Sequence, residues 1–198
     1  MPPRIDQAAL DTLFLKARTQ NGWLPTPVSD AELRELYDIM KMGPTSANSS
    51  PARIVFLRTP EAKARLLPAL TPGNVDKTKA APVTAIIGYD TRYYEWMARK
   101  LFAHRPEMAE NYAKNPGAAE VMAFRNGTLQ GAYLILAARA LGFVTAPMSG
   151  FNNAGVDEEF FAGTTLRSNF ICAIGHADQS KLMPRNPRLT FDEAGKVV

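Results

Sequence analysis

Apolar residues recur at helical spacing in three stretches of the chain. Residues 6–17 and residues 29–40 place their apolar side chains three or four positions apart. Ser29 followed by Glu32 is the capping-box pattern that begins a helix. Residues 118–142 carry the longest such pattern and are apolar on nearly every side in their second half. A helix of that kind is buried, so the sequence predicts a central helix that ends at a glycine.

Other apolar runs have the length and composition of strands. Residues 83–90, VTAIIGYD, form a near-continuous apolar run, which is typical of a strand buried on both faces. Residues 53–57, RIVFL, and residues 169–175, NFICAIG, are shorter runs of the same kind. Short helices are expected over residues 60–70 and near residues 157–161.

Residues 92–115 are different, because they combine many aromatic and charged side chains, and we expect a helical excursion from the core there. The predicted order of elements indicates an α+β fold with a small mixed sheet flanked by helices. We expect a single domain over residues 1–198. The central helix has more apolar surface than so small a sheet can cover, and the basic tail has no evident core partner. Both features favour burial against a second subunit.

Charge and cysteine content narrow the classes of function. The chain has 23 basic and 19 acidic residues, a net charge of +4, and no run of five like charges. This balance disfavours nucleic acid as a partner but leaves small anionic ligands. Cys172 is the only cysteine, which excludes an internal disulfide and fits a reducing compartment. With no apolar N-terminal region and no apolar run of about 18 residues, we expect a cytoplasmic protein that does not enter a membrane.

Several kinds of catalytic machinery have no counterpart in the sequence. The two histidines, His104 and His176, lack a cysteine or carboxylate at metal-ligand spacing, so no metal site is expected. There is no G-x-S-x-G turn and no phosphate-binding P-loop, and the strand at 83–90 is not followed by G-x-G-x-x-G. If the chain is an enzyme, its reactive group would therefore be a bound organic cofactor.

Four polar segments remain as candidate binding residues. They are ARTQNGW at 17–23, GPTSANSSP at 43–51, APMSGF at 146–151 and PRNPR at 184–188. Arginine guanidinium groups fork onto phosphate oxygens, and backbone N–H groups in a turn can complete the shell. The small polar residues at 43–51 either bond to their own backbone, as such residues usually do in turns, or contact a ligand.

In their order and spacing these segments resemble the nitroreductase family of FMN-dependent oxidoreductases, over nearly the whole chain. GPTSAN-x-SPARIVF, AFRN, PMSGF, SKL and PRL-x-F-x-EA are also similar to the malonic semialdehyde reductases of bacterial pyrimidine degradation. The resemblance implies a nitroreductase-like fold, an intertwined homodimer and FMN at the subunit interface. It further implies NADPH or NADH as hydride donor, two-step transfer through flavin N5, and reduction of malonic semialdehyde to 3-hydroxypropionate.

The same resemblance implies which residues contact FMN. The N-terminal and C-terminal arginines would bind the phosphate, the 43–51 loop would reach the flavin of the neighbouring subunit, and Ser149 and Gly150 would present backbone N–H groups to flavin N5. Ala17 stands where the family usually has an arginine, and Ser149 replaces a side chain that is often acidic. The complete set of implied FMN contacts is Arg18, Thr19, Gln20, Asn21, Pro44, Thr45, Ser46, Asn48, Pro147, Met148, Ser149, Gly150, Arg185 and Arg188.

A malonic semialdehyde carboxylate would need a cation, for which Arg99 and Arg105 are the main candidates and Arg53 and Arg125 are others. Two alternatives share the predicted flavin site. One is a broad-specificity nitro or quinone reductase, and the other is a flavin-binding protein without catalysis.

Overall fold

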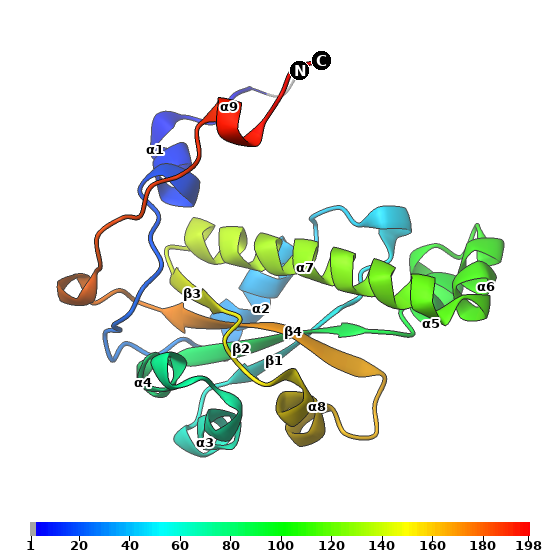
Figure 1. Ribbon diagram of the computed structural model, residues 1–198, viewed down its shortest axis with the longest axis horizontal. Coiled ribbons are helices and arrows are strands. Elements are labelled where there is room, and N and C mark those ends of the chain that lie inside the picture. The colour runs from blue at the N-terminus through cyan, green and yellow to red at the C-terminus, as the bar shows by residue number, and fades with distance from the viewer. Residues whose placement is uncertain (1–2) are drawn as a thin grey trace.

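The computed structural model describes residues 3–198, and its centre is a four-stranded sheet with helices on both faces (Figure 1). The sheet order is β1-β2-β4-β3. The strands span Ala52–Leu57 (β1), Val83–Asp90 (β2), Val144–Met148 (β3) and Leu166–Gly175 (β4). All eight residues of β2 are buried, which confirms the expectation of a strand covered on both faces.

The sheet is small, as expected, but its neighbouring strands pair antiparallel rather than in a mixed pattern. The long helix α7 (Pro116–Ala140) carries the chain back along the sheet, so β3 runs in the same direction as β2. The final strand β4 then enters between β2 and β3 in the opposite direction. Two strands that would otherwise have paired parallel are separated by a shared antiparallel neighbour.

One face of the sheet is covered by α2 and α7, and the other by α3, α4 and α8 (Figure 1). On the first face, Leu36 and Leu134 pack with Ile87 in one buried cluster. On the second face, Leu66 packs with Ile86 in another. The remaining helix bounds are Gln7–Leu10 (α1), Asp30–Met40 (α2), Pro60–Leu66 (α3), Pro72–Ala80 (α4), Tyr94–Trp96 (α5), Pro106–Lys114 (α6), Asn153–Phe161 (α8) and Phe191–Ala194 (α9).

Local signals predicted several boundaries correctly. Ser29 and Glu32 form the predicted capping box at the start of α2. Gly142 follows α7 with a φ of +81°, the left-handed conformation that glycine adopts readily. Over the expected excursion, the structure has α5, a π-helical turn at Met97–Leu101 and α6. They pack around Tyr93 in a buried cluster that also contains Tyr89 of β2 and Ala119 of α7.

Three further features differ from the sequence expectation. The first helix is shorter than residues 6–17, because α1 passes into a π-helical turn at Asp11–Leu15. Helix α4 was not predicted, since it buries only Thr78 and therefore carries no apolar stripe. Strand β3 was not predicted either. It contains Pro147, which a sheet tolerates at an edge strand such as this one.

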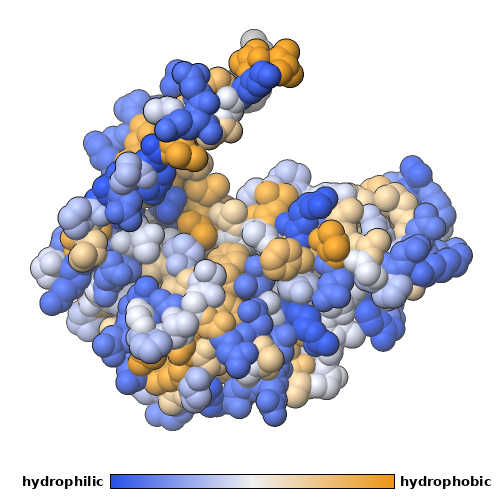
Figure 2. Space-filling view, in the orientation of Figure 1, coloured by the Kyte–Doolittle hydropathy of each residue, from blue (hydrophilic) through white to orange (hydrophobic). Residues whose placement is uncertain are grey.

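The two ends of the chain form an arm that projects from the body (Figure 1). We define the arm as residues 3–17 and 183–198. In space-filling view it overhangs a hollow beside the body (Figure 2). The arm exposes large apolar side chains, including Phe14 at 52%, Leu189 at 70% and Phe191 at 65%. Within residues 3–198, no helix has both the length and the apolar character required to cross a membrane.

Candidate functional site

A cationic cavity at the base of the arm brings together residues from both ends of the chain. Its volume is about 350 Å³. We call it the arginine cavity, and it collects five of the residues predicted to bind the cofactor. Its lining residues are Phe14, Ala17, Arg18, Thr19, Asn21, Arg139, Met183, Pro184, Arg185, Asn186 and Arg188.

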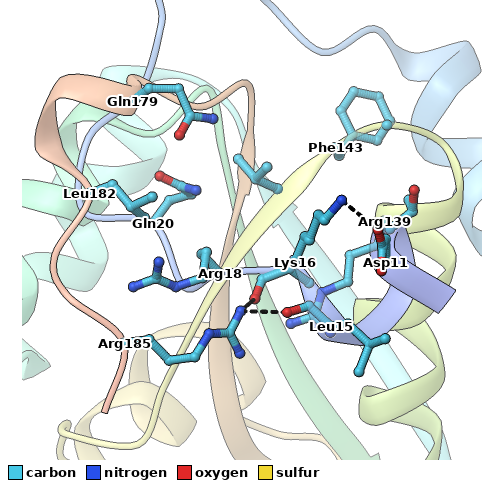
Figure 3. A pocket seen from close by; sticks show the side chains of 14 residues that line it. Asp11, Leu15, Lys16, Arg18, Gln20, Arg139, Phe143, Gln179, Leu182 and Arg185 are labelled. Atoms are coloured by element: carbon cyan, nitrogen blue, oxygen red, sulfur yellow. Dashed lines mark hydrogen bonds and ion pairs between the residues drawn. The ribbon is translucent and has the colours of Figure 1, made fainter. Parts of the chain in front are cut away.

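The three predicted arginines of this cavity donate to backbone carbonyls. Arg18 donates to the carbonyl of Met183. Arg188 donates through Nη1 to two carbonyls next to it in sequence, at 2.9 and 3.1 Å. Arg185 donates through Nη2 to the carbonyls of Leu15 and Ala17, both at 2.9 Å (Figure 3). Among residues 3–198 no carboxylate pairs with any of the three, so the cavity keeps its positive charge.

A second cavity of about 570 Å³ adjoins the first and shares Arg18, Arg139 and Arg185 with it (Figure 3). Gln20 lies here and is 2% exposed. Its side-chain Oε1 accepts no hydrogen bond within the described chain, and neither does Thr145 Oγ1. Buried polar atoms normally have a partner, so both atoms keep unused bonding capacity. Gln20 lines the cavity, whereas Thr145 is buried and is not part of its lining.

Arg139 lines both cavities and was not predicted from the sequence. It lies near the end of α7 and donates to the carbonyl of Leu13 at 2.7 Å, which ties the arm to the body. Burial lowers the pKa of its guanidinium, and Arg185 nearby acts in the same direction. The sequence feature that could have identified Arg139 is its position as an arginine within the otherwise apolar second half of the predicted central helix.

The predicted Ser149–Gly150 turn follows the end of β3. Within residues 3–198, the N–H groups of Ser149 and Gly150 have no acceptor. The Gly150 carbonyl, by contrast, accepts from Thr71 and from Asn74 at the start of α4. Thr71 and Asn74 were not singled out by the sequence, because α4 itself was not predicted.

The 43–51 loop lies elsewhere, along the middle of α7. Its residue Ser46 donates its N–H to Asn126 Oδ1 at 2.9 Å. Asn126 and Arg139 are 13 residues apart on α7, which corresponds to about 20 Å along the helix. Within one chain the loop and the arginine cavity therefore do not form one site.

The loop bonds partly to itself and partly to its surroundings. Thr45 Oγ1 accepts the Ser50 N–H at 3.1 Å, which is the self-capping alternative. The Asn48 amide instead donates to the Leu101 carbonyl of the excursion at 2.9 Å. Ala47, Asn48 and Ser50 have φ of +49°, +48° and +39°, an unusual concentration of left-handed backbone outside glycine.

The four arginines considered for a substrate carboxylate lie outside both cavities. Arg105 pairs with Glu107 on the surface. Arg53 pairs with the buried Asp90 at 3.0 Å and also donates to the carbonyls of Ser50 and Ala52. Arg99 and Arg125 are exposed and have no ion-pair partner in the described part of the chain.

Comparison with known proteins gives consistent relatives over most of the chain. The model of the nitroreductase family matches residues 16–176. Reut_A1586 of Cupriavidus pinatubonensis, provisionally described as an NADH dehydrogenase/NAD(P)H nitroreductase, is 60% identical over 187 residues, covering 93% of this chain and 95% of the relative. HadB of Ralstonia pickettii has the same provisional description and is 59% identical over 189 residues, covering 94% of this chain and 95% of HadB.

Solved structures share the fold at low sequence identity. The nitroreductase-like ydfN of Bacillus subtilis superposes with a TM-score of 0.85 at 19% identity, covering 98% of this chain and all of ydfN (100%). A nitroreductase-like protein of Exiguobacterium sibiricum, solved in complex with FMN, gives 0.83 at 17% identity with 100% of both chains covered. The family match, the curated relatives and the shared architecture lead to one conclusion: the chain belongs to the nitroreductase family.

Proposed function

We propose that this protein is an FMN-dependent oxidoreductase that takes a hydride from NADH or NADPH and passes it to a small organic acceptor. The observation that carries the proposal is the arginine cavity, where Arg18, Arg185 and Arg188 converge without a carboxylate. Membership of the nitroreductase family supports it, as do relatives described as NAD(P)H nitroreductases. The FMN complex of the Exiguobacterium protein supports the same cofactor.

The donor set fits FMN. Guanidinium groups suit a phosphate, because they donate in a planar fork and stay charged. The unpaired amide oxygen of Gln20, which lines the larger cavity, can bond to a ligand rich in donors. The unpaired N–H groups of Ser149 and Gly150 can donate to a ring nitrogen.

Bound FMN supplies hydride acceptance and donation at N5. The protein's own part would be binding and orientation. Arg18 and Arg188 would hold the phosphate, Gln20 would offer its amide to the cofactor, and the Ser149–Gly150 N–H groups would donate to N5. The overall balance is NAD(P)H, a proton and an aldehyde giving NAD(P)⁺ and an alcohol. The proton on the new hydroxyl comes from solvent.

The site is completed by a second copy of the chain. The proposal is supported by the separation of the 43–51 loop from the arginine cavity within one chain, and by the apolar arm. Leu189 and Phe191 on the arm, and Val121 and Phe124 on α7, are each at least 50% exposed. In a homodimer, Pro44, Thr45, Ser46 and Asn48 of one subunit would then approach the FMN of the other. Sedimentation equilibrium tests this, and a monomer that retains one FMN per chain would contradict it.

For the acceptor, we propose malonic semialdehyde, reduced to 3-hydroxypropionate, on the basis of the subgroup motifs named above. The exposed and unpaired Arg99 is then the better carboxylate partner, because Arg105 is already paired with Glu107. The descriptions of the 60% and 59% identical relatives favour a second candidate, a broader NAD(P)H nitroreductase.

One set of measurements tests both the flavin chemistry and the identity of the acceptor. The absorption spectrum of the purified protein is recorded, and NADPH and then NADH are titrated anaerobically. Loss of the flavin absorption band within the mixing time would support an oxidoreductase. Bound flavin that NADPH and NADH do not reduce would instead support a flavin-binding protein without catalysis. Turnover with malonic semialdehyde and with a nitroaromatic is then compared. A kcat/KM that is higher for the nitroaromatic would reject the aldehyde assignment.

A further inference from the structure

The Gly150 carbonyl is unusually well held. It accepts the Thr71 N–H at 3.0 Å, the Thr71 hydroxyl at 2.9 Å and the Asn74 amide at 2.9 Å. A carbonyl oxygen has two lone pairs, and most such groups in proteins accept one or two bonds. The three donors come from the first turn of α4 and the residue before it, far from Gly150 in sequence.

A tight turn links this carbonyl to the N–H that precedes it. The Phe151 N–H donates to the Ser149 carbonyl at 3.1 Å, which closes a three-residue turn centred on Gly150. In a trans peptide the N–H points opposite to the C=O. Fixing the Ser149 carbonyl therefore fixes the direction of the Gly150 N–H, the group without an acceptor.

The contact extends beyond one carbonyl. Asn152 donates its N–H to the Ala69 carbonyl at 2.8 Å, and Leu70 and Phe151 form an antiparallel bridge. Space at the turn is also fully used. A Cβ added at Gly150 would lie 2.6 Å from Thr71 Oγ1 and 2.9 Å from Asn74 Nδ2.

Helix α4 is itself fixed at its other end. The buried Nζ of Lys63 donates to the carbonyls of Lys79 and Ala81, at 2.9 and 2.7 Å. The Trp23 indole donates to the carbonyl of Lys77 at 3.0 Å. A cation near the C-terminal carbonyls also opposes the negative end of the helix dipole. The donors at Gly150 therefore stand on a helix that is held from both ends.

We propose that Thr71 and Asn74 are positioning residues that hold the Ser149–Gly150 peptide so that its N–H faces flavin N5. The inference rests on the proposed function, because it assigns N5 as the acceptor of that N–H. Oxidised N5 carries no proton and accepts a hydrogen bond, whereas reduced N5 carries one. An N–H held toward N5 therefore favours the oxidised cofactor, and loosening it raises the reduction potential.

The test uses the full-length flavoprotein and three substitutions. Thr71→Val keeps the side-chain shape and removes one donor, and Thr71→Ser keeps the donor. Gly73→Ala is the matched control in the same helix turn, since an added Cβ there meets nothing within 4 Å. For each protein we would measure FMN affinity of the apoprotein, the two-electron midpoint potential and single-turnover reduction by NADPH.

We expect Thr71→Val to lower the ratio of the affinities for oxidised and reduced FMN about tenfold. For a two-electron couple this raises the midpoint potential by roughly 30 mV. Thr71→Ser and Gly73→Ala should stay at the wild-type potential. If Thr71→Val does not fold by circular dichroism, Asn74→Ala removes another of the three donors and should give the same shift. An unchanged potential in the folded variant, or an equal shift in Thr71→Ser, would overturn the inference. Failure of the proposed function is seen separately, as wild-type protein that binds no FMN.

Discussion

Replacing Arg188 with alanine tests the cofactor assignment most directly. Arg188 uses Nη1 for two neighbouring carbonyls, which leaves Nη2 and Nε as donors toward the arginine cavity. A hydrogen bond to a charged group contributes about 1.5–3 kcal/mol. At 1.4 kcal/mol per tenfold, Arg188→Ala should weaken FMN binding by about 10- to 150-fold. Because Arg188 is exposed in the single chain, salt screening places the expected loss near tenfold at physiological ionic strength.

The assay compares FMN with riboflavin, which has the same ring and polyol but no phosphate. Each is titrated into apoprotein and followed by quenching of flavin fluorescence. Arg188→Ala should weaken FMN and leave riboflavin within about twofold. Arg34→Ala is the charge-matched control, since Arg34 is exposed on α2 outside both cavities. It should leave both ligands unaffected.

Arg185 provides an internal contrast. Its Nη2 is committed to the carbonyls of Leu15 and Ala17, so Arg185→Ala should also disturb the arm. We expect it to weaken FMN and riboflavin together. If Arg188→Ala weakens riboflavin as much as FMN, Arg188 has a structural role and the phosphate assignment is wrong.

Three further predictions concern stability. Asn48 has a φ of +48°, so Asn48→Ala should lower the free energy of unfolding by about 1–2 kcal/mol. Asn48→Gly should lower it by less, because glycine adopts this backbone conformation readily. Equal losses in urea titrations would show that backbone conformation is not the cause. Asp90→Ala should lower the free energy of unfolding by about 3–5 kcal/mol, because it leaves the partly buried guanidinium of Arg53 without its carboxylate. Arg105→Ala breaks an exposed pair with Glu107 and should lower it by less than about 1 kcal/mol. A similar loss in both variants would refute the distinction. Burial raises the pKa of the Cys172 thiol from 9.0 to about 12. The contribution of this thiol to stability is therefore complete below pH 9.0 and is lost as the pH rises toward 12. Cys172→Ala should flatten the alkaline decline of the urea midpoint, and an unchanged slope would contradict this prediction.

The sequence by itself determined the elements whose signals are local. The apolar run of β2, the capping box of α2 and the glycine after α7 each identify their element, because burial and capping depend on residues within a few positions. The family resemblance rests on short motifs in a fixed order, and the family match confirms it. The helical character of residues 92–115 was expected from a composition that differs from that of the core.

Tertiary structure alone decided the features that depend on distant contacts. Helix α4 has no apolar stripe, and its stability comes from Lys63 and Trp23 at one end and the Gly150 carbonyl at the other. The antiparallel order of the sheet follows from where β4 enters, which no local pattern encodes. The arginine cavity likewise forms only when the two chain ends meet beside Arg139, since side chains more than a hundred residues apart become neighbours solely through folding.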